Sequence, residues 1–310
     1  MKIVFMGTMD FAVELLEGLM NHHEVSLVVT QPDRPSGRKQ KLKASPVKKK
    51  ATELGLALFQ PKNIKRNHKP ILEQHADIHV VAGYGQMIPG NVLDAPPHDS
   101  VNVHASLLPK YRGGSPMHAA IKNGDEYTGV TTMKMVKRMD AGPIYDQIKV
   151  DIAPNDNVGT LEHKLSTAGR RLLLDTLRDI EKGTATLSDQ DKEQVSFAYH
   201  IRPKDRYLDF TQTAEDLRNH IRAFNPWPIA RFKIDDETCK VYEAKVIKED
   251  KPFGQPGEVV IADKKRLHIQ TKKHQLAIMS IQYPGKKRMD IGAFMNGVGR
   301  SLFYEGKIIK

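Results

Sequence analysis

The sequence predicts an α/β protein in which a Rossmann-like, doubly wound parallel sheet forms an N-terminal domain and a smaller OB-like antiparallel β-barrel forms a C-terminal domain. Two patterns lead to this prediction. In the first half of the chain, short apolar runs alternate with amphipathic helical patterns, as in β-α-β units whose parallel strands are covered by helices on both faces. After about residue 230, short strand-like runs follow one another without intervening helices, which is typical of a small antiparallel barrel.

The N-terminal domain is expected to cover residues 1–187. Its strand-like runs are, in chain order, KIVFMG, VSLVV, LALF, IHVVAGYG and SVNVH, and DFAVELLEGLM predicts a helix after the first of them. A second amphipathic helix is predicted for TLEHKLSTAGRRLLLDTLRDIEKG, with Gly183 as its stop signal. Ligands of doubly wound sheets bind beyond the carboxyl ends of the strands, so the site is expected in the loops there. The first of these loops, GTMDFA, lacks the G-x-G-x-x-G pattern of a dinucleotide site.

A linker is predicted for residues 188–207, beginning with the polar run SDQDKEQ, and the C-terminal domain for residues 208–310. TAEDLRNHIRAF predicts a helix that ends at the following NPWP, and the strand-like runs are RFKI, KVYEAKVI, GEVVIA, RLHIQ and LAIMSIQ. The run DKKRLHIQTKKH gives this domain a basic surface. OB-like barrels often bind nucleic acid through such a face, so contacts with phosphates are expected here.

The composition, with 39% hydrophobic and 27% charged residues among 310, is typical of a soluble globular protein. No apolar run approaches the roughly 18 residues that a membrane-spanning helix needs, and the N-terminal run is too short for the core of a signal peptide. The single cysteine, Cys239, excludes an internal disulfide framework and indicates a reducing compartment. We therefore expect a cytoplasmic protein without membrane association, and a monomer, because no segment has the pattern of a coiled coil.

Positive charge is concentrated in one stretch. The formal net charge of the chain is +11, and residues 31–50, QPDRPSGRKQKLKASPVKKK, hold six Lys and two Arg against one Asp, a net of +7. An excess of cationic charge favours polyanions as partners. A charge run of this kind is often only a solvated, flexible loop, so charge by itself leaves the partner open.

Asn102 and His104 end the last apolar run of the predicted sheet, in the stretch VNVHASLLPKYRGGSP. Residues two positions apart on a strand project to the same face, so these side chains would lie side by side at its carboxyl end. An Asn amide can donate a hydrogen bond to a developing oxyanion, and a His can hold or release a proton near neutral pH. The pair therefore suits nucleophilic attack on a carbonyl carbon.

A carboxylate near His104 would orient its imidazole and favour the charged form. The best candidate is Asp140 in MVKRMDAGPIY, at another junction between a strand and a loop, while Asp125 and Glu126 in the turn-like NGDE run are weaker candidates. Metal is not expected, because no group of His and Cys has the spacing of metal ligands.

The run SLLPKYRGGSP after this pair resembles the folate-site signature of the 10-formyltetrahydrofolate-dependent formyltransferases. The resemblance extends over residues 2–300, through GTMDFA, TQPDRPSGRKQKLKASPVK, VVAGYGQMIP, the Asp140-Ala141-Gly142 turn, SFAYHI, IRAFNPWP and PGKKRMD. It is strongest to the branch of the family whose acceptor is initiator methionyl-tRNA. The branch acting on glycinamide ribonucleotide is similar only in the catalytic domain and lacks the basic insertion and the C-terminal barrel.

This resemblance implies a role for each part of the site. Asn102, His104 and Asp140 would be the catalytic residues, and the tetrahydrofolate contacts would come from Ser106, Leu107, Leu108 and Pro109. The tRNA contacts would come from Arg38, Lys39, Lys41 and Lys43, with further contacts from the C-terminal domain. The co-substrate would be 10-formyltetrahydrofolate, without a metal, and the product would serve translation initiation in protein biosynthesis.

Two other functions remain open from the sequence. A formyltransferase acting on a sugar nucleotide would share the Asn, His, Asp set and the folate loop, but would have no use for the +7 stretch. An RNA-binding protein without catalytic activity would use the basic surfaces but leave the Asn102-x-His104 pair without a role.

Overall fold

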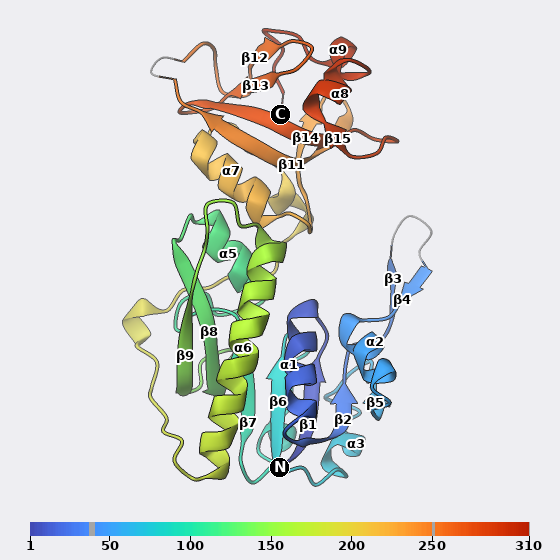
Figure 1. Cartoon of the computed structure of the whole chain (residues 1–310), viewed down its shortest axis with the longest axis vertical. Coiled ribbons are helices and arrows are strands. Elements are labelled where there is room, and N and C mark those ends of the chain that lie inside the picture. Colours follow the sequence, from blue (N-terminus) through green and yellow to red (C-terminus); the bar gives the residue numbers. More distant parts are fainter. Residues whose placement is uncertain (37–40, 250–251, 310) are drawn as a thin grey trace. The chain divides into compact units, whose positions relative to one another are not determined.

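The computed structural model describes residues 1–36, 41–249 and 252–309. Its described part divides into two compact units (Figure 1). The first comprises Met1–Pro116, Tyr127–Asp151 and Glu162–His200, and the second comprises Met117–Glu126, Ile152–Leu161 and Ile201–Lys310. The second unit thus includes two short segments that precede the predicted C-terminal domain, and the domain limits inferred from the sequence stay a prediction.

The first unit is built on a seven-stranded sheet with the order β5-β2-β1-β6-β7-β8-β9. The first five strands of this order run parallel, whereas β8 is antiparallel to β7 and β9 is antiparallel to β8. The strands are β1 (Lys2–Gly7), β2 (Glu24–Val29), β5 (Leu58–Phe59), β6 (Ile78–Ala82), β7 (Ser100–His104), β8 (Tyr127–Lys134) and β9 (Ile144–Asp151).

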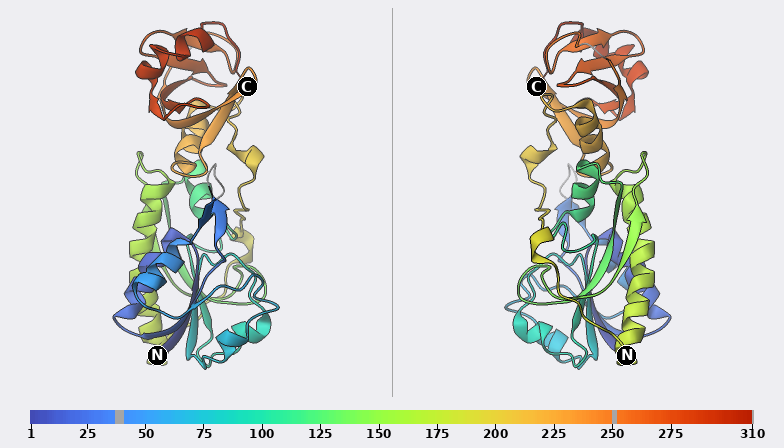
Figure 2. Two further views of the ribbon diagram at one scale, coloured as in Figure 1. Left: turned by 90° about the vertical axis from the view of Figure 1, so that its right-hand side faces the viewer. Right: turned by 90° about the vertical axis from the view of Figure 1, so that its left-hand side faces the viewer.

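Helices cover both faces of this sheet (Figure 2). This agrees with the burial of nearly every residue of β1, β6 and β7, since both faces of these strands must be covered. One face of the central strand β1 belongs to a core formed with the chain between β5 and β7, where Val4 and Met6 pack with Ile71 and Val92. α6 lies on the same face of the sheet as α1. This is shown by the ideal Cβ position of Gly169 in α6, which is 3.5 Å from the ring of Phe11 in α1. The helices are α1 (Asp10–Met20), α2 (Pro46–Glu53), α3 (Lys69–Leu72), α4 (Gly90–Leu93) and α6 (Val158–Glu181).

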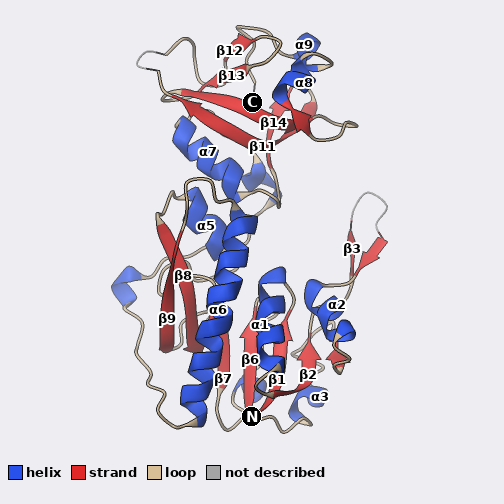
Figure 3. Ribbon diagram, viewed as in Figure 1, coloured by secondary structure: helices blue, strands red, loops and turns tan. Residues whose placement is uncertain are grey.

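The second unit contains a six-stranded antiparallel sheet, shown by the red strands of the C-terminal part in Figure 3. Its order is β10-β11-β14-β13-β12, with β15 paired to β14. Thr213 begins α7 with a capping box, in which its hydroxyl accepts from the backbone N–H of Asp216 and the Asp216 carboxylate accepts from the backbone N–H of Thr213. The elements are α5 (Pro116–Lys122), α7 (Ala214–Ala223), β10 (Ala230–Ile234), β11 (Glu237–Ile247), β12 (Val259–Ala262), β13 (Leu267–Gln270), β14 (Gln275–Gln282), β15 (Met289–Asp290), α8 (Ile291–Met295) and α9 (Gly299–Leu302).

The predicted fold class is confirmed: a mostly parallel sheet with helices forms the N-terminal part and an antiparallel half-barrel of the OB-like kind follows. The antiparallel direction of β8 and β9 is the difference from a wholly parallel sheet. Two short 3-10 helices, Lys192–Gln194 and Pro203–Arg206, lie in the segment between the two sheets. Within the described ranges, no helix is both long and apolar enough to span a membrane.

Candidate active site

The strand β7 presents Asn102 and His104 on one face of the sheet. Their backbones pair with Met133 and Thr131 of β8, and the relative exposures of the two residues are 8% and 7%. The intervening Val103 faces the other way, toward α6, with Cγ1 3.6 Å from the ideal Cβ position of Gly169. Within the described part of the chain, the Asn102 carboxamide takes part in no hydrogen bond, so this nearly buried amide is available to a substrate.

The imidazole of His104 contacts a backbone carbonyl on one side and a carboxylate on the other. Its Nε2 lies 3.0 Å from the carbonyl oxygen of Tyr111. Because a carbonyl can only accept, Nε2 carries a proton in this arrangement. Its Nδ1 lies 3.8 Å from Oδ2 of Asp140, which is too far for a hydrogen bond. Nδ1 therefore makes no hydrogen bond with any described residue and is the ring nitrogen that can contact a reacting group.

Asp140 lies in the connection between β8 and β9, and its backbone has a φ of +48°. A non-glycine residue in this left-handed region is uncommon and marks a tightly constrained turn. The Oδ2 atom of Asp140 accepts a hydrogen bond from the backbone N–H of Gly113 at 2.8 Å. One carboxylate oxygen thus faces both His104 and the glycine loop. The structure brings together the three residues that the sequence singled out for catalysis, although their roles stay a prediction.

The segment Ser106–Pro109 is fixed against the antiparallel strands. The Thr131 hydroxyl donates to the carbonyl of Ser106 at 2.6 Å and accepts from the backbone N–H of Leu108 at 3.1 Å. Gln147 of β9 donates to the carbonyl of Leu108 at 2.9 Å. The Leu108 side chain packs with Met133 and Ile144 in a small buried cluster. The backbone of this segment, which follows His104 in the chain, is therefore held to β8 and β9.

Two further residues, Arg112 and Gln190, support the site; sequence reasoning gave them no role, although Arg112 lies in the SLLPKYRGGSP run. Arg112 is 4% exposed, and its guanidinium donates from Nε and Nη2 to Oε1 of Gln190 at 3.0 and 2.6 Å. Burial lowers the pKa of Arg112, and the nearby Arg138 lowers it further, while the charge of Asp140 opposes this shift. Gln190 is 78 residues away in the sequence. No motif connects two such distant residues, so only the folded chain could show the contact.

The stretch with a net charge of +7 forms a helix and a short hairpin in its described part. β3 (Arg34–Ser36) pairs antiparallel with β4 (Lys41–Lys43). Lys41 and Lys43 are both exposed on β4. Arg38 and Lys39, which the sequence also assigned to tRNA contacts, lie outside the described residues. The hairpin is followed by Ser45, whose hydroxyl accepts from the backbone N–H of Lys48 and begins α2.

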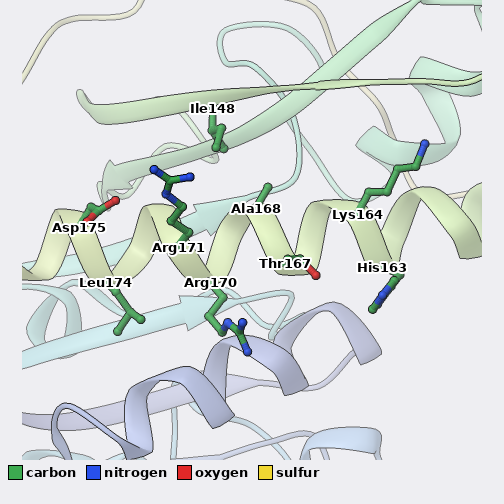
Figure 4. A pocket seen from close by; sticks show the side chains of 9 residues that line it. All are labelled: Ile148, His163, Lys164, Thr167, Ala168, Arg170, Arg171, Leu174 and Asp175. Atoms are coloured by element: carbon green, nitrogen blue, oxygen red, sulfur yellow. The ribbon is translucent and has the colours of Figure 1, made fainter.

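A separate surface pocket lies along α6 and next to β9 (Figure 4). It is lined by Ile148, His163, Lys164, Thr167, Ala168, Arg170, Arg171, Leu174 and Asp175. None of these residues belongs to the set around His104. Among the residues that the structure describes, no group of three or more His, Cys, Asp or Glu side chains could hold a metal ion.

The single cysteine lies away from this site, in the core of the second unit. Cys239 is fully buried on β11, and burial raises the pKa of its thiol to about 12. A neutral, inaccessible thiol is a poor nucleophile and a poor metal ligand.

Comparison with known proteins agrees with this geometry. The family model described as "Formyl transferase" matches residues 1–177, and the model described as "Formyl transferase, C-terminal domain" matches residues 200–299. Proteins named methionyl-tRNA formyltransferase from Macrococcus caseolyticus and Listeria monocytogenes are 44% and 43% identical to the chain over 304 residues, with 97% of both partners covered in each case.

The solved structures share the fold at lower identity. An N-formyltransferase from Helicobacter canadensis, in complex with folinic acid and dTDP-3-aminofucose, superimposes with a TM-score of 0.67 at 20% identity, covering 91% of this chain and 99% of that one. With the N-terminal family model matching more than half of the chain, and with relatives above 40% identity along nearly its whole length, the chain belongs to the formyl transferase family.

Proposed function

We propose that this chain transfers the formyl group of 10-formyltetrahydrofolate to the free amino group of methionine on initiator methionyl-tRNA. The observation that carries the proposal is the identity of 42–44% over 97% of the chain to relatives named methionyl-tRNA formyltransferase. The likeness to sugar-acting enzymes is confined to the fold, at 20% identity. The acceptor is therefore taken from the similar full-length relatives.

The chemistry assigns complementary tasks to Asn102 and His104. The folate compound supplies a formyl carbon with a carbonyl oxygen, and the neutral amine of the acceptor attacks that carbon. Negative charge then develops on the oxygen, where preorganised donors are most effective because they are already aligned before the reaction. The carboxamide of Asn102, which makes no hydrogen bond with any described residue, and the Nδ1 side of His104 are the donors available for that oxygen. Each contributes about 3 kcal/mol by analogy with other oxyanion sites.

Asp140 has two tasks in this proposal. Its carboxylate, with Oδ2 3.8 Å from Nδ1 of His104, orients the imidazole that donates to the oxygen. It also accepts, directly or through water, the proton that the attacking amine has to lose, and returns it to the folate nitrogen as the bond between that nitrogen and the formyl carbon breaks. The hydrogen bond from the Gly113 N–H keeps the carboxylate in place while it performs both tasks.

We assign the folate contacts to Ser106, Leu107, Leu108 and Pro109. Their backbone is tied to Thr131 and Gln147, so the segment can offer a fixed surface to a flat ring. The tRNA contacts are assigned to Lys41 and Lys43 of the hairpin, with Arg38 and Lys39 beside them in the sequence. Clustered cations of this kind contact phosphates. The protein would act as a monomer in the cytoplasm, where initiator tRNA is charged.

The test is formyl transfer from 10-formyltetrahydrofolate to charged initiator tRNA by the wild type, by His104→Ala and by His163→Ala. His163 is an exposed histidine on α6 and serves as the matched control. We expect His104→Ala to lose about 100- to 1,000-fold in kcat with little change in KM for tRNA, and His163→Ala to retain activity. A wild type that formylates an amino sugar but ignores charged tRNA would overturn the proposed acceptor.

A further inference from the structure

Gln190 holds together two loops of the active site. Its Oε1 accepts from Nε and Nη2 of Arg112 at 3.0 and 2.6 Å. Its Nε2 donates to the carbonyls of Asp140 and Gly142 at 2.9 and 2.7 Å. Gln190 is 9% exposed; its hydrogen bonds with Arg112 and Gly142 are buried, and the one with Asp140 is partly buried. A single carboxamide thus connects the loop after β7 with the turn that carries Asp140.

We propose that Gln190 is a positioning residue for formyl transfer, which sets the place of the Asp140 carboxylate relative to His104 without contacting substrate. The proposal rests on the proposed function in its choice of acceptor, and on the geometry of the site in everything else. Gln190 acts on Asp140 through the main chain, at the carbonyl of the same residue whose side chain faces His104.

The turn around Asp140 needs such a support. Its φ of +48° is unfavourable for a residue with a side chain. Gly142, two residues further, approaches the backbone of β8 so closely that an ideal Cβ there would overlap the carbonyl oxygen of Lys134. Both residues of this constrained turn present their carbonyls to Gln190. Removal of the donor would leave these two carbonyls without this partner and would free the turn to relax.

The acceptor atom of the Gln190 side chain also binds a residue that is held in place, Arg112. Arg112 is buried and is held by its backbone to the segment that carries Gln190, since its N–H donates to Ser196 and its carbonyl accepts from Ala198, at 2.9 and 2.8 Å. The next residue along the chain is Gly113, the donor to the Asp140 carboxylate. Gln190 therefore constrains Asp140 in two ways. It binds the backbone carbonyl of Asp140 directly, and it binds Arg112, which precedes the residue that donates to the Asp140 carboxylate.

The substitution Gln190→Glu separates the contact with Arg112 from the contact with the Asp140 turn. Gln190→Glu keeps the shape of the side chain and keeps an acceptor for Arg112, with which it would form an ion pair. It removes the hydrogen-bond donor of this side chain, because an ionised carboxylate can only accept. It also places negative charge against the carbonyls of Asp140 and Gly142. The Arg112 contact is thus retained while the tie to the catalytic turn is lost.

The experiment compares wild type, Gln190→Glu and Gln194→Glu in steady-state formyl transfer, with melting temperatures measured for all three. Gln194 is exposed on the same segment, and its side chain donates to Asp191, so its variant carries the same charge change away from the site. We expect kcat of Gln190→Glu to fall about 10- to 100-fold, because a misplacement of about 1 Å has this effect on catalysis. KM for both substrates and the activity of Gln194→Glu should stay within about 2-fold of wild type.

A lower melting temperature with an unchanged kcat would overturn the proposal, because Gln190 would then only stabilise the fold. A rise in KM for tRNA or folate with an unchanged kcat would also overturn it. If Gln190→Glu does not fold, Gln190→Asn replaces it: the neutral amide is too short to reach both loops, so the same loss of kcat is expected. If the wild type uses another acceptor than tRNA, the proposed function fails, and the comparison made with that acceptor still decides the role of Gln190.

Discussion

The Oδ2 atom of Asp140 lies 3.8 Å from Nδ1 of His104 and 2.8 Å from the backbone nitrogen of Gly113. These three residues come from the β8–β9 connection, from β7 and from the loop after β7. The carboxylate oxygen therefore faces an imidazole and also accepts from a fixed backbone donor. A hydrogen bond from a neutral backbone group holds it in position without neutralising its charge.

Asp140→Asn separates the charge of this group from its shape. The Asn carbonyl oxygen can still accept from Gly113, so the loop should keep its place, while the negative charge beside His104 is lost. We expect kcat to fall about 100-fold or more, the typical contribution of a positioned acid or base, with a melting temperature within about 3 °C of wild type. Measurement of both quantities decides the matter: a variant with nearly full kcat would show that the charge of Asp140 is dispensable.

Gly113→Ala should disrupt the same contact by crowding. Gly113 has a φ of +116°, and an ideal Cβ at this position would lie 2.6 Å from the carbonyl oxygen of Ala198. The strain would push the loop away from the segment that follows Gln190, and the N–H donor to Asp140 would move with it. We expect a lower melting temperature and a kcat reduced at least about 10-fold.

The matched control for that variant is Gly55→Ala. Gly55 also has a positive φ, +67°, but an added Cβ would meet no atom within 4 Å. This control should lose about 1 kcal/mol of stability through backbone strain and keep its activity. Equal loss of kcat in both glycine variants would show that crowding at Ala198 is unimportant.

The sequence predicted the five parallel strands of the first sheet but not its two antiparallel strands. β7 could be placed because SVNVH is an uninterrupted strand-like run, and the two-residue period then assigned Asn102 and His104 to one face. β8 and β9 were not among the strand-like runs predicted from the sequence, because β8 buries Thr side chains and β9 is a mostly exposed strand at the edge of the sheet. Their antiparallel direction could not be predicted either, because a burial pattern does not distinguish a strand from its reverse. The hydrogen bonds of Gln190 join segments 48 to 78 residues apart, and a local pattern carries no information on such contacts.

Lys41→Ala combined with Lys43→Ala should weaken tRNA binding in a salt-dependent way. Each phosphate contact adds about 0.7 to 0.9 to the slope of log affinity against log salt concentration, so the double variant should lower that slope by about 1 to 2. KM for charged tRNA should rise while kcat stays unchanged, because both side chains are exposed on β4. The control is Lys62→Ala with Lys65→Ala, which removes two exposed charges elsewhere in the first unit. The same change in slope in the control would assign the effect to net charge alone.

His79 makes the stability of the first unit depend on pH. It lies on β6 with a relative exposure of 2%, and burial lowers its pKa to about 4. In the unfolded chain its pKa is close to 6.5. Between these two values the unfolded state binds a proton that the folded state does not, so the free energy of unfolding decreases as the pH falls from about 6.5 to about 4. The difference between the two pKa values corresponds to a loss of about 3 kcal/mol.

His79→Gln removes this titration and should flatten the dependence over the same range. The change is measured by urea unfolding at several pH values from 7 to about 4, as the difference between variant and wild type, since carboxylates contribute equally to both. His22→Gln, at an exposed histidine, should follow the wild type. The variant is expected to be less stable than wild type near pH 7, because it loses the buried hydrogen bond between Nδ1 of the imidazole and Oγ of Ser100, 3.4 Å apart. The gap should narrow as the pH falls, and a gap that stays constant down to pH about 4 would mean that His79 titrates alike in the folded and unfolded chain.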